Sequence, residues 1–247
     1  MKLAILDLDG TVYRGSEPCP YAPETICDLV EAGVAVRYLT NNSAAEPEAI
    51  SEKLMAMGVP CEPDWVYGTG PAAARYCRDE GWRRVFVVGE PALIRSVEAA
   101  GLESVQENAE VVLVGICRGF TYDWLNNALQ QLRQGARFVA TNLDPTYPKE
   151  NGRFEPGAGS LIAAIRTCSE RDPIVVGKPE PTMVLQILQD CGVAPGDAIV
   201  VGDRADTDLE SGRRAGVPTW LVLTGVTFEP IPGQQGSPDL RGLLGLI

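Results

Sequence analysis

Two aspartates near the N-terminus have the type and spacing to do chemistry around a bound cation. Asp7 and Asp9 directly follow the apolar run LAIL, within the segment Asp-Leu-Asp-Gly-Thr. Parallel sheets bind ligands beyond the C-terminal ends of their strands, which is where this pair would stand. Two carboxylates this close repel each other unless a cation lies between them. The competing interpretation is an acidic turn closed by an Asx hydrogen bond.

Three further polar segments also follow apolar runs. The segment TNNS (40–43) offers a hydroxyl and backbone N–H groups that can cradle an anion, although it is also ordinary turn chemistry. Lys178, between a glycine and a proline, can supply a point charge for a phosphoryl group or can be a solvated surface lysine. Asp203 begins an acidic segment on a turn, where a metal ligand would stand, whereas Asp206 in the same segment also fits helix capping.

These four segments support one another because of their order. Carboxylates, a hydroxyl, a lysine and further carboxylates each come at the end of a different apolar run. Phosphoryl transfer needs these groups, since it depends on positioning and on neutralisation of charge. We therefore expect a phosphoryl-transfer site.

The elements that must position these residues alternate along the chain. Short apolar runs read as strands covered on both faces, and the segments between them have helical spacing with proline starts and glycine stops. This alternation predicts an α/β fold with a doubly wound parallel sheet. The longest irregular segment, 142–159, is rich in Pro, Gly and Asn, and loops of that length are usually functional.

Composition excludes several classes of protein. The 247 residues carry a net charge of −12, which argues against nucleic acid or an anionic membrane as partner. The chain has no histidine, so His-based triads and His-containing zinc sites are excluded and an oxygen-rich magnesium site is favoured. Seven cysteines without a CxxC pair are expected to be reduced thiols. The N-terminus reads as a first strand rather than a signal peptide, so we expect a cytoplasmic protein.

The segments DLDGTVYRG, TNNS, ATNLDPTYP, PGAGS, GKPEP and GDRADTD…LVLTG resemble those of the haloacid dehalogenase superfamily, specifically its branch of NagD-like, p-nitrophenyl and phosphoglycolate phosphatases. The resemblance covers nearly the whole chain. It implies a Rossmann-like core with a smaller inserted α/β cap and a Mg²⁺-dependent phosphatase. It places the core at 1–81 and 174–247 and the cap at 82–173.

The resemblance also implies roles for the two aspartates at the first strand. Asp7 would be the nucleophile, forming an aspartyl-phosphate, and would bind Mg²⁺. Asp9 would protonate the leaving oxygen and then activate water, and its backbone carbonyl would bind Mg²⁺. Gly10 and Thr11 would shape the loop, and 12–17 would form a flap hairpin.

The remaining core residues would hold the phosphoryl group and the metal. By the same resemblance, Thr40 and the backbone N–H of Asn41 would bind the phosphoryl group, and Lys178 would neutralise it. Asp203 would bind Mg²⁺ directly, and Asp208 would hold a metal-bound water.

In this branch the loop around ATNLD lies in the cap and faces the site. It supplies the candidate substrate-selecting residues, although a hydrated turn explains any one of them equally well. These candidates are Asn142, Asp144, Tyr147, Lys149, Asn151 and Arg153.

The substrate is expected to be a small phosphorylated metabolite, with 2-phosphoglycolate and p-nitrophenyl phosphate favoured over sugar phosphates and nucleotides. Pyridoxal phosphate is disfavoured because the relative that acts on it carries a histidine in this loop. Relatives often dimerise through the cap, so a homodimer is expected. A catalytically quiet binding protein and a receiver-type signalling domain are the alternatives, and the second acid at Asp9 and the long insertion argue against the latter.

Overall fold

The computed structural model describes residues 1–148 and 153–247. The chain divides into two compact units. The first unit comprises residues 1–40, 47–67 and 178–247, and the second comprises 41–46 and 68–177. Among the described residues, no helix has both the length and the apolar character needed to cross a membrane.

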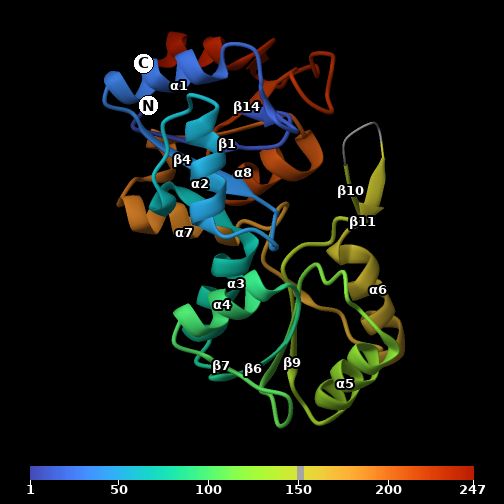
Figure 1. The fold of residues 1–247 in the computed structure, drawn as a ribbon. Helices are drawn as coiled ribbons and strands as arrows, with labels where there is room; N and C mark the ends of the chain where they lie inside the picture. Colours follow the sequence, from blue (N-terminus) through green and yellow to red (C-terminus); the bar gives the residue numbers. More distant parts are fainter. Residues whose placement is uncertain (149–152) are drawn as a thin grey trace. The chain divides into compact units, whose positions relative to one another are not determined.

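A six-stranded sheet forms the centre of the first unit, in the order β15-β14-β13-β1-β4-β5 (Figure 1). The two central strands, β1 and β13, are buried at every residue, as expected for apolar runs in a sheet covered on both faces. β1 pairs in parallel with both β13 and β4. The bounds are β1 Leu3–Asp7, β4 Ala35–Thr40, β5 Val66–Gly68, β13 Ala198–Gly202, β14 Thr219–Val222 and β15 Gly236–Ser237.

Helices connect these strands, so the predicted α/β alternation with parallel pairing is confirmed. The first helix, α1, buries Ile26 and Leu29 and packs against β4, and Gly33 follows it with a φ of +81°. The helices and turns of this unit are α1 Ala22–Glu31, α2 Pro47–Ala56, η1 Pro63–Trp65, α7 Thr182–Cys191, η3 Pro195–Asp197, η4 Ala205–Leu209, α8 Glu210–Arg214 and η5 Leu240–Leu246. A hairpin of β2 (Tyr13–Arg14) and β3 (Glu17–Pro18) follows β1.

The second unit contains a parallel five-stranded sheet in the order β12-β9-β8-β6-β7. Helices α5 and α6 cover one face and α3 and α4 the other (Figure 1). The apolar core between the sheet and these two helices includes Phe86 and Val112 from the strands and Leu132 and Ile162 from α5 and α6. The bounds are α3 Thr69–Asp79, β6 Arg84–Val88, α4 Pro91–Ala99, β7 Glu103–Ser104, β8 Val111–Val114, α5 Tyr122–Arg133, β9 Arg137–Ala140, β10 Thr146–Pro148, β11 Phe154–Pro156, α6 Ala158–Ser169 and β12 Ile174–Val175.

Two features of the second unit bear on the expected cap. Strands β10 and β11 pair as an antiparallel hairpin inside the segment that the sequence indicated as irregular. Helix α3, which the sequence assigned to the core, packs against α4 within the second unit. The division into 1–81 and 174–247 against 82–173 stays a prediction, and the compact units differ from it at 41–46, at 68–81, which contains α3, and at 174–177.

Candidate active site

Asp7 and Asp203 stand at the ends of neighbouring strands in the first unit. Asp7 is the last residue of β1, and Asp203 follows Gly202, the last residue of β13. These strands pair in parallel, with Leu6 opposite Val201. Both aspartates therefore leave the sheet at the same edge, which is the edge where parallel sheets bind ligands.

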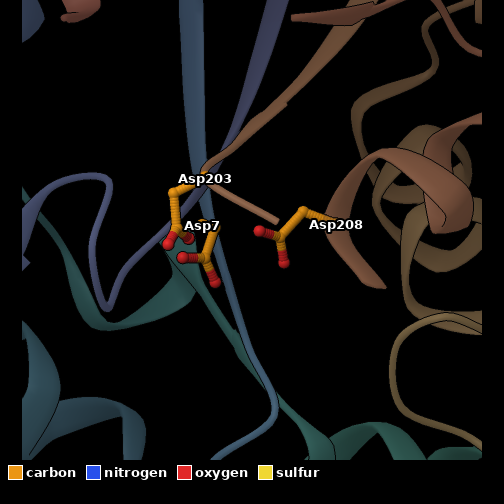
Figure 2. Close-up of side chains that lie close together, drawn as sticks. All are labelled: Asp7, Asp203 and Asp208. Carbon is orange, nitrogen blue, oxygen red and sulfur yellow. The ribbon is translucent and has the colours of Figure 1, made fainter. Parts of the chain in front are cut away.

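Asp208 joins this pair from η4. One carboxylate oxygen from each of Asp7, Asp203 and Asp208 lies within 4.8 Å of the others, and the three carboxylates are drawn close together in Figure 2. Their exposed fractions are 7%, 1% and 2%. Asp203 Oδ2 accepts a hydrogen bond from the Val226 N–H at 2.5 Å, whereas its buried Oδ1 has no hydrogen-bond partner among the described residues. An unpaired buried carboxylate oxygen is costly unless a cation binds it.

Lys178 brings the positive charge that the sequence predicted for this edge. Its Nζ donates a hydrogen bond to Asp7 Oδ1 and another to Asp208 Oδ1, the second at 2.7 Å. The side chain is 5% exposed, so this lysine is not a solvated surface residue. One ammonium therefore bridges two of the three carboxylates, and the group keeps a net negative charge.

The pKa values of these groups reflect that imbalance. Burial raises the pKa of Asp7 well above its ordinary value and Asp208 raises it further, while Lys178 opposes both effects. Burial, and then Asp208, raise the pKa of Asp203 to about 6. Burial alone would lower the pKa of Lys178, but Asp208 and Asp7 outweigh it, and the pKa stands above its ordinary value. A further cation would relieve the strain on the carboxylates.

The group fits a divalent cation with a preference for oxygen. The atoms that could bind a metal are all carboxylate oxygens, and the buried Asp203 Oδ1 has no hydrogen-bond partner among the described residues. Lys178 does not balance the negative charge of the three carboxylates. Mg²⁺ binds such sites through one or two carboxylates and keeps several waters. Asp7 and Asp203 are therefore suited to hold Mg²⁺, and their role as metal ligands stays a prediction. The side chain of Asp9 is not in this group, and the expected role of its backbone carbonyl remains a prediction.

Glycines let the backbone pass close to the carboxylates. Gly10 has a φ of +91°, which is strained for other residues, and a Cβ there would lie 2.6 Å from Asp203 Oδ2. A Cβ on Gly225 would overlap the same oxygen, and one on Gly202 would overlap Asp208. The Thr224 hydroxyl donates to the Gly10 carbonyl at 2.7 Å. The backbone at these glycines thus packs directly against the side chains of Asp203 and Asp208.

Asp9 lies beside the hairpin that follows β1. Its side chain is exposed, yet the atoms packed around the carboxyl still raise its pKa by desolvation, against opposing effects of Lys53, Lys178 and Tyr13. The Tyr13 hydroxyl points at Asp9 Oδ2 at 3.5 Å, and Lys53 Nζ lies 3.5 Å from the centroid of the Tyr13 ring. A raised pKa favours the protonated form that a general acid requires.

Thr40 and Asn41 fall on either side of the boundary between the units. Thr40 ends β4 in the first unit, is 4% exposed, and follows Leu39, whose register partner is Asp7. The expected hydroxyl therefore stands at the same sheet edge as the carboxylates. Asn41 belongs to the second unit, where its Nδ2 donates to Asp144 Oδ2 at 2.9 Å.

The candidate substrate-selecting residues of the second unit have different surroundings. Asn142 is 4% exposed and donates to the Asn41 carbonyl at 2.7 Å. Tyr147 accepts a hydrogen bond from Arg118 at 2.7 Å and donates one to Glu155. Arg153 is exposed immediately before β11. Lys149 and Asn151 lie outside the described residues.

Sequence comparison decides the family. Residues 4–103 match the family described as haloacid dehalogenase-like hydrolase, and residues 175–237 match a related description. The 5′-nucleotidase YutF of Bacillus subtilis (strain 168) is 36% identical over 224 residues, which cover 90% of this chain and 87% of that protein. The chain belongs to the haloacid dehalogenase-like hydrolase family.

Solved structures of this family have the same fold. A p-nitrophenyl phosphatase from Archaeoglobus fulgidus superimposes with a TM-score of 0.92 at 32% identity, covering 100% of this chain and 99% of that one. A glycerol phosphate phosphatase from Mycobacterium tuberculosis, in complex with magnesium, superimposes with a TM-score of 0.88 at 32% identity, covering 98% of this chain and 76% of that one. Within the haloacid dehalogenase-like hydrolases, this chain is a phosphoric monoester hydrolase of the NagD-like branch.

Sequence reasoning missed three residues that contact the candidates in this hydrolase. Tyr13 and Lys53 surround Asp9, and the Thr69 hydroxyl donates to the Asn41 carbonyl at 2.9 Å. The position of Tyr13 in the expected flap was a usable signal. Lys53 and Thr69 had none, because their contacts depend on how α2 and α3 pack.

Proposed function

We propose that this hydrolase cleaves small phosphate monoesters in a Mg²⁺-dependent reaction through an aspartyl-phosphate on Asp7. The observation that carries the proposal is the buried group of Asp7, Asp203 and Asp208, bridged by Lys178 at the end of the central strand. This group is rich in carboxylates, and its buried Asp203 Oδ1 has no hydrogen-bond partner among the described residues.

Asp7 and Asp9 each take part in both chemical steps. In the first step an Asp7 oxygen bonds to phosphorus, and the bond from phosphorus to the leaving oxygen breaks while Asp9 gives that oxygen its proton. In the second step Asp9 takes a proton from water, whose oxygen bonds to phosphorus. The Asp7–phosphorus bond then breaks, and inorganic phosphate is released.

Asp7 and Asp203 would hold Mg²⁺ directly, with the Asp9 carbonyl as a third ligand and Asp208 binding a coordinated water. When bound, Mg²⁺ supplies positive charge that lets an anionic nucleophile approach an anionic phosphate. Lys178 adds a fixed charge for the phosphoryl oxygens. The Thr40 hydroxyl and the Asn41 N–H would donate hydrogen bonds to the same oxygens.

The substrate is proposed to be a small phosphorylated metabolite. Relatives are named 5′-nucleotidase, acid sugar phosphatase, glycerol-3-phosphate phosphatase and p-nitrophenyl phosphatase, so the family name does not fix the leaving group. We favour 2-phosphoglycolate or p-nitrophenyl phosphate, with sugar phosphates, nucleotides and pyridoxal phosphate as alternatives. A cytoplasmic location and a homodimer through the expected cap, 82–173, are further parts of this proposal, and sedimentation analysis tests the dimer.

The test is hydrolysis of p-nitrophenyl phosphate by the purified protein with Mg²⁺, with Ca²⁺, and with a chelator. Turnover should require Mg²⁺, and Ca²⁺ should substitute poorly because it prefers longer bonds and higher coordination. Equal rates with the two ions would contradict inner-shell attack by Asp7. Absence of hydrolysis with Mg²⁺ across a panel of phosphoglycolate, sugar phosphates, nucleotides and pyridoxal phosphate would overturn the proposal.

A further inference from the structure

The residues proposed to hold the phosphoryl group stand directly beside the points where the chain passes between its two units. Thr40 ends a segment of the first unit, and Asn41 is the first residue of the next segment, in the second unit. Gly177 ends the second unit, and Lys178 resumes the first. Whatever holds Asn41 and Gly177 in the second unit therefore also constrains Thr40 and Lys178 through one peptide bond each.

Asn41 is held by three side chains of the second unit. Its carbonyl accepts hydrogen bonds from Asn142 Nδ2 at 2.7 Å and from the Thr69 hydroxyl at 2.9 Å. Its own Nδ2 donates to Asp144 Oδ2 at 2.9 Å. The Asp144 N–H in turn donates to Asn142 Oδ1 at 3.1 Å. The two residues that bond Asn41 are therefore also bonded to each other. This closed arrangement defines the orientation of the peptide group that follows Asn41.

Gly177 meets the same loop. Its N–H donates to the Thr141 carbonyl at 2.7 Å. A Cβ at this position would overlap that carbonyl and would lie 2.7 Å from Asn41 Oδ1, so only glycine lets these segments approach so closely. Residues 141–144 therefore contact both segments that carry the proposed phosphoryl-binding residues.

Burial argues that Thr69 and Asn142 act through Asn41, whereas Asp144 is only partly buried and is linked to it by hydrogen bonds. Thr69 is fully buried and Asn142 is 4% exposed, and the polar groups of both are engaged with the Asn41 carbonyl. A leaving group would find little surface on either. Buried, fully bonded polar groups fix one geometry, because breaking a single bond leaves the other partner unsatisfied.

We propose that Asn142, Asp144 and Thr69 are positioning residues that fix the phosphoryl-binding segment at Asn41, and that Asn142 and Asp144 do not select the leaving group. This inference rests on the proposed function, since it assigns the residues to a step that every phosphate ester shares. It replaces the substrate-selecting role expected of Asn142 and Asp144 with a positioning role. Loss of their hydrogen bonds should impair all substrates equally.

The test compares variants that delete a hydrogen bond with variants that keep it. Thr69→Val, Asn142→Ala and Asp144→Ala delete one, whereas Thr69→Ser and Asp144→Asn keep the same donor or acceptor. Ser160→Ala is the matched control, because Ser160 donates to the Pro145 carbonyl of the same loop without touching Asn41.

Three measurements are made on the full chain with Mg²⁺. They are kcat and KM on p-nitrophenyl phosphate and on glycerol phosphate, the thermal midpoint, and amide hydrogen exchange of a peptide covering 41–46. The deleting variants should lose about tenfold or more in kcat/KM, equally on both substrates, with faster exchange in 41–46. The conserving variants and Ser160→Ala should stay near the parent protein.

Each outcome bears on the inference. A shift in the ratio between the two substrates would return Asn142 and Asp144 to substrate selection and overturn it. Unchanged kinetics and exchange in an active parent protein would overturn it as well. If the parent protein hydrolysed nothing but exchange still rose in the deleting variants, the proposed function would fail and the hydrogen-bond linkage would stand. If one deleting variant unfolds, the comparison is made with the other matched pair, either Thr69→Val against Thr69→Ser or Asp144→Ala against Asp144→Asn.

Discussion

Lys178 Nζ donates a hydrogen bond to Asp208 Oδ1 at 2.7 Å, and both side chains are almost fully buried. Because the same ammonium also bonds Asp7, the cation has two carboxylate partners. Loss of one partner would therefore leave Lys178 paired with the other. Breaking a buried pair is severely destabilising when it leaves an isolated charge, and this arrangement avoids that.

Asp7→Asn should consequently abolish turnover while the protein stays folded. The amide keeps the shape of the side chain but is neither a nucleophile nor an anionic ligand, and Asp208 keeps Lys178 in place. The measurement is p-nitrophenyl phosphate hydrolysis with circular dichroism as the check on folding. Asp206→Asn is the matched control, because Asp206 is exposed in the same acidic segment and pairs only with Arg204 among the described residues. Near-normal hydrolysis by Asp7→Asn would refute the mechanism.

Asp9→Asn should lower kcat by about 10²–10⁴-fold, the range typical of a lost general acid–base group. Burial raises the pKa of Asp9, which favours the protonated form that the first step needs, and an amide cannot transfer that proton. The effect should be smaller on p-nitrophenyl phosphate than on an alkyl phosphate, because nitrophenolate leaves without a proton. Comparing kcat on p-nitrophenyl phosphate and glycerol phosphate checks this. Equal and mild losses would assign proton transfer to solvent.

Asp203→Asn should stabilise the metal-free protein near neutral pH. Its folded-state pKa of about 6 lies above its ordinary value of 3.8, chiefly through burial and then through Asp208. A raised carboxyl pKa means that stability is present at low pH and is lost as pH rises through about 6. About two pKa units correspond to on the order of 3 kcal/mol. The amide oxygen can still accept from Val226.

Thermal midpoints of the parent protein and the variant, each with a chelator, test this between pH 4 and pH 8. The variant should be the more stable above pH 6, and the difference should shrink towards pH 4. Asp206→Asn should show no such gain, because Arg204 lowers the pKa of that carboxyl. A variant less stable than the parent protein at pH 7.5 would show that the ionised Asp203 carboxylate does not destabilise the folded protein.

The carboxylate group was predictable because one rule places it. Parallel strands end at a common edge, so Asp7, Thr40 and Asp203 had to come together once their apolar runs were identified as neighbours in one sheet. The bridge from Lys178 to Asp208 was not predictable in detail. Asp208 lies five residues past Asp203, and its direction depends on the π-helical turn of η4.

Other features depend on packing that local sequence does not record. Helix α3 has the same pattern whether it covers the first or the second sheet, so its partner α4 could not be inferred from periodicity. The β10–β11 hairpin has three residues on each strand, which is too short for an alternating pattern to stand out among Pro, Gly and Asn. The contact between Lys53 and Tyr13 joins two elements about 40 residues apart.

The β10–β11 hairpin, rather than the loop at Asn142, should govern which ester is used. Tyr147 lies on β10, and its hydroxyl links Arg118 to Glu155 on β11, so one side chain braces both strands. Arg153 is exposed beside β11 with a charge that can attract an anionic leaving group. Such remote contacts select between substrates when they are stronger in the transition state of one of them.

Arg153→Ala and Tyr147→Phe should each shift the ratio of kcat/KM between p-nitrophenyl phosphate and 2-phosphoglycolate by about tenfold, or about 1.4 kcal/mol of differential transition-state binding. Arg153→Ala should leave the thermal midpoint unchanged, because the side chain is exposed, whereas Tyr147→Phe should lower it slightly through the lost brace. Arg133→Ala, at the exposed end of α5, is the matched control for loss of a positive charge in the same unit. Equal losses on both esters would assign the hairpin to catalysis or folding, and unchanged kinetics would make it a solvated turn.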